Sequence, residues 1–350
     1  MERTSNFDLE KIFGKSLETV DNIIANMEKH VRHFEIPKRT GGKRKLIAPD
    51  EQLKWIQRRL VWLIFLHYKP EHNAHGFVKD RSIVTNAVNH VAPMSMGHVD
   101  IKDFFDTINE GHLKNCLFGN KHMCRYCKNY EGMLNGKCNP SIYKNKIKDY
   151  EHKCEELKAV FIPNYCEKKG YDSLFTRVIK LCTYNNAAVQ GFPTSPYVAN
   201  IVLRGFDKKI QAVAEANECV YSRYADDLTF SSKKHTADEL AKIFKDVSYR
   251  TLWAFGFKAK KEKTWWKDSG RFRICGVVVN VKTNIMRRTI RKFRAKVHHA
   301  VVKHADRTTK SHIRKLKGWA SYLFSINNSQ GEKYMKILTD FEKTRWPIAA

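Results

Sequence analysis

Three aspartates stand where acidic side chains are unexpected in a chain this basic. Asp226 and Asp227 lie between two runs rich in β-forming residues, and Asp100 follows an apolar stretch. Carboxylates in apolar surroundings need a counter-charge, because an unpaired buried charge is costly. Magnesium supplies one, since it takes oxygen ligands and bridges to substrate phosphates. Two such ions, about 3.5–4 Å apart, can hold the attacking and leaving oxygens of a phosphoryl transfer. An ordinary Asp-rich turn is the alternative interpretation.

The charge balance also points to phosphate chemistry. The 350 residues include 64 Lys and Arg against 36 Asp and Glu, a net charge of +28. Such a surplus on a folded chain indicates a polyanionic partner, the alternative being a merely soluble basic surface. The 42% apolar content excludes a disordered chain. The longest apolar run, 60–66, is far below the ~20 residues of a membrane-spanning helix. We therefore expect a cytoplasmic protein with no membrane contact.

Two predicted β-structures carry the three aspartates. Around Asp100, apolar and polar residues alternate over 97–105, as in a strand with one polar face. The stretch 219–232 predicts a hairpin with Asp226 and Asp227 at its tip.

Other elements frame these strands. A basic hairpin is expected over 36–49 around Gly41-Gly42, and Asp50 can cap the helix that follows it. From residue 285 onward, apolar stripes at helical spacing run among dense Arg and Lys, which predicts a basic helical end.

The segment 112–172 has weak hydrophobic periodicity and holds most of the nine cysteines, which indicates an insertion. Cys124 and Cys127 form a C-x2-C pair, and Cys138 with Cys154 would complete a four-thiolate structural zinc site. Other possible ligands are His122, His152 and Cys166. The alternative is a set of reduced thiols without metal.

Three of these stretches, in order, resemble the sequence boxes of reverse transcriptases. They are D-I-K-D-F-F at 100–105, Q-G-F-P-T-S-P at 190–196 and Y-A-D-D at 224–227. The boxes upstream at 75–77 and downstream at 256–264 also match, so the resemblance covers roughly residues 36–330.

The spacing Asn86-Ala87-x-x-His90 is similar to a mark of bacterial retron reverse transcriptases. The V-T-G triplet usual in that group is here Ile274-Cys275-Gly276, which departs at two of three positions. The resemblance implies an α+β right-hand polymerase fold, with fingers, a palm built on an antiparallel sheet and a helical thumb. The expected segments are an N-terminal helical part (1–35), fingers with the first palm part (36–96), the palm with its Cys-rich insertion (97–280) and the thumb (281–350).

The resemblance also implies the catalytic roles. Asp100, Asp226 and Asp227 would be the catalytic acids and would hold two Mg2+ ions, together with the backbone carbonyl of Ile101. Phe105 would stand under the nucleotide sugar and exclude ribonucleotides; plain core packing is its alternative.

Further residues would bind dNTP. Gln190 and Gly191 would line the pocket, and Lys45, Arg44 or Lys38 would hold the triphosphate. Lys263 would protonate the departing pyrophosphate. For these cations, simple solvated charge is the alternative.

Two groups of residues are expected to bind RNA. Asn86 and His90 would share one helix face, although a histidine in such a place is more often structural. Clustered cations of the thumb would grip an RNA stem, which is read by shape and backbone. These cations are Arg287, Arg288, Arg291, Lys292 and Arg294.

The function that this resemblance implies is a Mg2+-dependent RNA-directed DNA polymerase. In retrons it copies a cognate noncoding RNA from the 2′-hydroxyl of a guanosine and yields branched msDNA. Its partners would be that RNA, the msDNA product, dNTPs and an effector protein for defence against phage. The alternatives are a group-II-like, CRISPR-linked or abortive-infection reverse transcriptase, or a non-catalytic RNA-binding scaffold.

Overall fold

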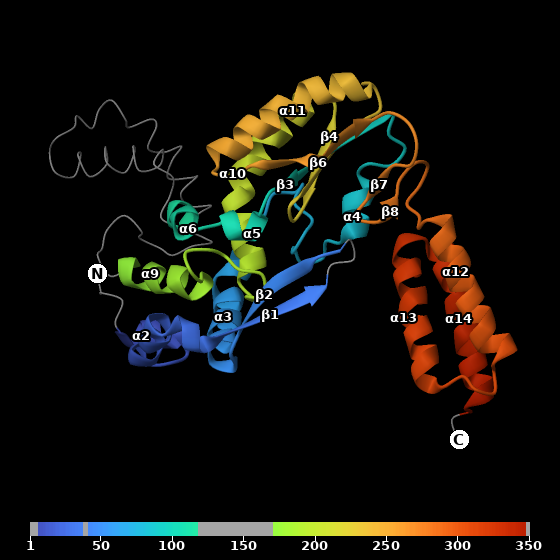
Figure 1. The fold of residues 1–350 in the computed structure, drawn as a ribbon, viewed down its shortest axis with the longest axis horizontal. Coiled ribbons are helices and arrows are strands. Elements are labelled where there is room, and N and C mark those ends of the chain that lie inside the picture. The colour runs from blue at the N-terminus through green and yellow to red at the C-terminus, as the bar shows by residue number, and fades with distance from the viewer. Residues whose placement is uncertain (1–5, 38–40, 118–170, 348–350) are drawn as a thin grey trace. The chain divides into compact units, whose positions relative to one another are not determined.

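The computed structural model describes residues 6–37, 41–117 and 171–347. Figure 1 shows the fold of the chain as a ribbon. The chain divides into two compact units, each built from separated segments. The first unit comprises 1–71, 102–206 and 254–257, and the second comprises 72–101, 207–253 and 258–350. The zinc candidates Cys124, Cys127, Cys138 and Cys154, and also Lys38, lie outside the described residues. The division into fingers, palm and thumb at the expected boundaries stays a prediction.

The first unit combines short helices with a two-stranded antiparallel hairpin of β1 (Val31–Pro37) and β2 (Lys43–Pro49). Both Gly41 and Gly42 have positive φ, as the predicted turn requires. The Asp50 side chain accepts a hydrogen bond from Leu53 N at 2.8 Å and so caps the next helix. The helices are α1 (Asn6–Phe13), α2 (Leu17–Ala25), α3 (Glu51–Leu63), α5 (Phe104–Thr107), α6 (Glu110–Leu117) and α9 (Tyr171–Cys182), with 3-10 turns at Met27–His30 and Phe65–His67.

The second unit contains a four-stranded antiparallel sheet in the order β4-β5-β3-β6. Its strands are β3 (Ser95–Ile101), β4 (Val220–Tyr224), β5 (Asp227–Ser232) and β6 (Ala259–Lys267). The helix α11 (Ala237–Ala254) packs on it, with the rings of Phe244 and Phe230 stacked at 4.5 Å. The helix α10 (Ser195–Ala216) passes from the first unit into the second. This mixture of helices with an antiparallel sheet confirms the predicted α+β class.

The remaining elements of the second unit follow the sheet or precede it. The short helix α4 (Ile83–Val88) begins with a capping box between Ser82 and Thr85. A small hairpin, β7 (Arg273–Ile274) with β8 (Val277–Val278), leads to the C-terminal helices. These are α12 (Arg287–His298), a π-helical turn (His299–Lys303), α13 (Lys310–Ile326) and α14 (Asn328–Arg345).

The three C-terminal helices, drawn in orange to red in Figure 1, pack around one apolar cluster. Phe293 and Val297 of α12 are buried in it. The helix α13 adds the apolar stripe predicted from sequence, and α14 adds Tyr334 and Leu338. The same cluster includes Met96 of β3 and Ala87 of α4, so it joins the helices to the sheet. In the part of the chain that the structure describes, no helix is long and apolar enough to cross a membrane.

Candidate active site

The sheet of the second unit brings the acid-bearing strands together. Asp100, near the end of β3, lies directly opposite Asp227, the first residue of β5. Tyr224 pairs with Asp227 across the β4–β5 hairpin, so Ala225 and Asp226 form its two-residue loop. The Ile101 N–H donates to the Asp226 carbonyl at 3.0 Å, which fixes the loop beside the end of β3. The predicted hairpin therefore places the acids of two distant boxes at one edge of the sheet.

The loop is held in an unusual backbone conformation. Ala225 has a φ of +58°, a region that residues with a side chain rarely adopt. Arg223 Nη1 donates to the Ala225 carbonyl at 3.1 Å. Gly76 packs against the loop so closely that a Cβ there would lie 2.4 Å from Ala225 N. This close approach explains the glycine of the upstream box, because no larger residue fits.

A buried ion pair lies behind this loop. Arg223 and Asp207 have side chains that are 0% and 1% exposed, and two nitrogens of the guanidinium contact the two carboxylate oxygens. Tyr221 also donates its hydroxyl to Asp207, at 2.8 Å. Sequence reasoning missed this pair, because its partners lie on α10 and β4 and no local pattern links them.

The electrostatics of the acids point to a cation. Burial, and then the charge of Asp227, raises the pKa of Asp226 to about 6. Burial, and then the charge of Asp100, likewise raises the pKa of Asp227 to about 6. Lys263 Nζ lies 2.5 Å from Asp100 Oδ2 and its pKa is raised by that hydrogen bond. One ammonium cannot neutralise three carboxylates, so the site retains an excess of negative charge.

The donor set fits a divalent cation. His98, Asp100 and Asp227 each offer one ligand atom, and these atoms lie within 4.8 Å of one another. Asp226 is on the adjoining loop and supplies a further carboxylate. Oxygen-rich sites of this kind suit Mg2+. Sequence reasoning overlooked His98, although the two-residue period of a strand places it on the same face as Asp100.

Residues expected to bind dNTP lie in the first unit, apart from Lys263. The Gln190 carbonyl accepts a hydrogen bond from Ile47 N at 2.9 Å, so the 190–191 loop lies beside β2. Gly191 has a φ of +126°, and a Cβ there would be 2.3 Å from the Ile47 carbonyl oxygen. Arg44 and Lys45, also on β2, are exposed. The structure thus brings the Gln190-Gly191 loop and the strand with both candidate phosphate-binding cations together.

Phe105 is not on a strand as expected. The strand β3 ends at Ile101, Asp103 has a φ of +45°, and Phe104 to Thr107 form the short helix α5. Phe104 is buried at 5% exposure, whereas Phe105 is half-buried and contacts the Phe104 ring at 5.1 Å. Strand alternation therefore does not decide which of the two rings faces inward; the helical turn does.

The structure corrects the prediction that Asn86 and His90 offer one surface to RNA. Asn86 is 0% exposed and His90 is 1% exposed. The His90 ring contacts Ser231 Oγ at 2.6 Å and Ser222 Oγ at 2.7 Å, and burial lowers its pKa to about 3. A neutral imidazole thus joins the segment after α4 to both strands of the acid-bearing hairpin. The physical reason for the correction is that α4 ends at Val88 and packs into the core.

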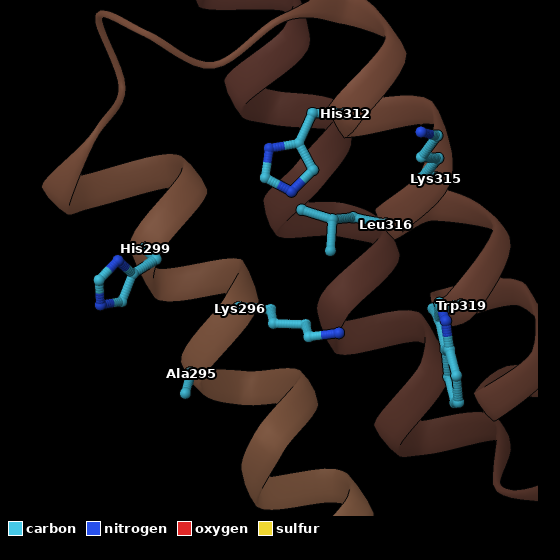
Figure 2. A pocket seen from close by; sticks show the side chains of 7 residues that line it. All are labelled: Ala295, Lys296, His299, His312, Lys315, Leu316 and Trp319. Carbon is cyan, nitrogen blue, oxygen red and sulfur yellow. The ribbon is translucent and has the colours of Figure 1, made fainter.

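The five cations predicted to bind RNA are exposed on α12, on the side away from buried Phe293 and Val297. They are Arg287, Arg288, Arg291, Lys292 and Arg294. Next to them, α12, the π-helical turn and α13 form a groove of about 530 Å³. Figure 2 shows Lys296 extending across it from α12 toward Leu316. The rest of its lining is Ala295, His299, His312, Lys315 and Trp319, and none of the lining residues is acidic.

The motifs, sheet and clustered acids are those of a nucleic acid polymerase that uses a palm domain. A family model described as "Reverse transcriptase (RNA-dependent DNA polymerase)" matches residues 36–279, which is more than half of the chain. The chain belongs to the reverse transcriptase family.

Curated relatives narrow the resemblance to retron enzymes, as predicted. Retron Mx65 reverse transcriptase of Myxococcus xanthus is 29% identical over 87% of this chain and 64% of its own length. Retron Mx162 reverse transcriptase, from the same organism, is 28% identical over 90% of this chain and 61% of its own. Retron Ec86 reverse transcriptase of Escherichia coli is 25% identical over 96% and 89%, respectively. The chain thus spans less than two thirds of the length of the two Myxococcus relatives.

Proposed function

We propose that this chain is a retron-type reverse transcriptase, an RNA-directed DNA polymerase that uses Mg2+ and dNTPs. It copies part of a cognate structured noncoding RNA, starts from the 2′-hydroxyl of a guanosine and yields branched msDNA. With an effector protein, the complex serves in defence against phage. The priming, the msDNA product and the defence role rest on the similarity to the retron relatives.

One observation carries the catalytic part of the proposal. Asp100 and Asp227 face each other across β3 and β5, with Asp226 on the adjoining loop, and two of the three have raised pKa values. Asp100, Asp226 and the Ile101 carbonyl would hold the metals, with Asp227 at the periphery. Bound divalent ions activate the primer hydroxyl and neutralise charge on the phosphates. The presence of all three acids counts against a non-catalytic scaffold.

The nucleotide and the RNA would bind at separate elements. In the first unit, Gln190 and Gly191 would line the dNTP pocket, and Lys45 or Arg44 would hold the triphosphate. Phe105 would exclude the 2′-hydroxyl. Lys263, which is half-exposed beside Asp100, would protonate the pyrophosphate once its ion pair opens.

The basic face of α12 and the adjoining groove would hold the RNA. Duplex RNA is read mainly through shape and backbone phosphates, so exposed Arg and Lys provide the necessary chemistry. In residues 281–350, seventeen Lys and Arg stand against four Asp and Glu. Three of those four acids lie on α14, and the groove has none.

Copurifying nucleic acid tests the proposal. The protein is expressed from its native locus, and the bound nucleic acid is treated with RNase, DNase or debranching enzyme and separated on denaturing gels. We expect a short DNA whose mobility changes after RNase and after debranching. The Asp226→Asn/Asp227→Asn variant should retain RNA and contain no DNA. Asp238→Asn, at an acid in the first turn of α11, is the matched control and should behave as the wild type.

Two other results would each assign the chain to a different class of protein. If the DNA carries no branch, the chain is a DNA polymerase but not a retron enzyme, and another type of bacterial reverse transcriptase is the better assignment. RNA alone, even after incubation with dNTPs and Mg2+, identifies a non-catalytic RNA-binding scaffold.

A further inference from the structure

His98 lies among the acids of the candidate site without a role in the proposed polymerase. It pairs with Thr229 in the β3–β5 register, two positions from the Asp100–Asp227 pair. Its Nε2 is 3.5 Å from Asp227 Oδ1. Ligand atoms of His98, Asp100 and Asp227 all lie within 4.8 Å of one another. A nitrogen donor is therefore built into a site whose other donors are carboxylates.

The imidazole is held in place from the neighbouring strand. His98 pairs with Trp265 in the β3–β6 register, and the two rings stack at 5.7 Å with an interplanar angle of 28°. The ammonium of Lys267 lies 4.8 Å from the centre of the Trp265 ring on the same strand. The side chain of His98 is only 19% exposed. This packing restricts the ring, so its approach to Asp227 is a fixed feature and not one of many surface rotamers.

The separations suit a common ion. Around a divalent cation with bonds of about 2.1 Å, adjacent ligand atoms are about 3 Å apart and opposite ones about 4.2 Å apart. The spacing of His98, Asp100 and Asp227 lies close to this range, so small side-chain adjustments suffice. Lys263, which pairs with Asp100, is half-exposed and can turn away into solvent.

We infer that His98, Asp100 and Asp227 form a mixed nitrogen and oxygen site that binds a divalent transition-metal ion more tightly than Mg2+. Mg2+ demands oxygen ligands and gives up its water reluctantly. Divalent transition ions accept an imidazole nitrogen readily. The inference rests on the proposed function, because Asp100 is one of its proposed metal ligands. It adds that His98 and the peripheral Asp227 also act as ligands, and which class of ion the site prefers.

Mn2+ is the probe, because its paramagnetism reports its ligands directly. The full-length protein, free of any His tag, is titrated with Mn2+ and free ion is measured by electron paramagnetic resonance. Pulsed spectra of the bound ion then detect coupling to a coordinated ¹⁴N nucleus. We expect this coupling in the wild type and its loss in His98→Gln, whose Mn2+ Kd should rise about tenfold or more. The Kd for Mg2+, measured by competition, should change little.

Controls separate the possible failures. His235→Ala changes a partly exposed histidine on another loop and should leave the Mn2+ Kd and the ¹⁴N coupling intact. Circular dichroism checks that His98→Gln is folded, and a wild-type spectrum without ¹⁴N coupling overturns the inference whatever the variant does.

If Asp100→Asn abolishes Mn2+ binding while His98→Gln does not weaken it, only the role of His98 is wrong. If neither Asp100→Asn nor Asp226→Asn affects metal binding or DNA synthesis, the proposed function fails as well.

Discussion

The acid-bearing sheet and the basic C-terminal helices use charge in opposite ways. In the sheet, charged groups meet specific partners: Arg223 and Asp207 are both buried, and the buried carboxylate of Asp100 pairs with the half-exposed Lys263. On α12, the five predicted RNA-binding cations are all exposed. A buried charge needs a particular partner at a particular distance, because desolvation is otherwise uncompensated. An exposed charge facing a polyanion contributes through its sign and approximate place.

The difference predicts how each region responds to substitution. Changes in the sheet should be large and strongly coupled, since several residues fix one loop. Changes on α12 should be small and additive, because separated phosphate contacts act independently.

The buried pair should dominate stability. Arg223→Met leaves the Asp207 carboxylate buried without its counter-charge, although the Tyr221 hydroxyl still donates to it. The free energy of unfolding should fall by about 3–5 kcal/mol. Restoring neutrality with Arg223→Met/Asp207→Leu should recover a large part of that loss. Denaturant unfolding measures both variants. Arg291→Met, on exposed α12, is the matched control and should stay within about 0.5 kcal/mol of wild type. Equal losses in the two single variants would remove the contrast between the regions.

The loop that carries Asp226 should be sensitive to its neighbour Gly76. Gly76→Ala puts a Cβ 2.4 Å from Ala225 N, so the loop must shift. A displacement of about 1 Å at a catalytic group costs on the order of 10²-fold in rate. Primer extension over a range of dNTP concentrations measures this loss and separates kcat from KM. Gly318→Ala, at a position on α13 with nothing within 4 Å, should leave the rate unchanged. Full activity in Gly76→Ala would show that the close contact does not position the acid.

Stability should also depend on pH through the two raised carboxyl groups. The pKa values of Asp226 and Asp227 are about 6 in the folded chain, above the ordinary value of 3.8. The folded state therefore binds more protons between these values, and stability should rise as pH falls from 7 toward 5. The measurement is the melting temperature without divalent ions, compared with Asp226→Asn/Asp227→Asn. The variant should lack this component of the pH dependence. Added Mg2+ should reduce it in the wild type, because the ion favours the ionised carboxylates.

Sequence reasoning anticipated the features that follow local rules. Alternation and turn chemistry predicted the Asp226-Asp227 hairpin, and spacing predicted the basic hairpin and its following helix. It erred where tertiary packing decides: Phe105 lies on a short helix and not on a strand, and Asn86 and His90 are buried. The Arg223–Asp207 pair gave no local signal, since its partners meet only when α10 packs beside β4. Residue type suggests a chemistry, but burial decides whether the group meets solvent, ligand or core.

The smallest effects are expected on the basic helix, and there additivity is the decisive observation. Replacing Arg291 by Ala should remove about one phosphate contact, weaken RNA binding a few-fold and reduce the slope of log K against log salt by about 0.7–0.9. Arg287→Ala should do the same, and the double variant should lose the sum of the two free energies. Filter binding over a range of salt concentrations measures each. Lys336→Ala, an exposed cation on α14, should leave the slope unchanged if RNA lies on the α12 side. A loss in the double variant far beyond the sum would mean that these arginines act as a positioned set, like the residues of the sheet, and not as a diffuse field.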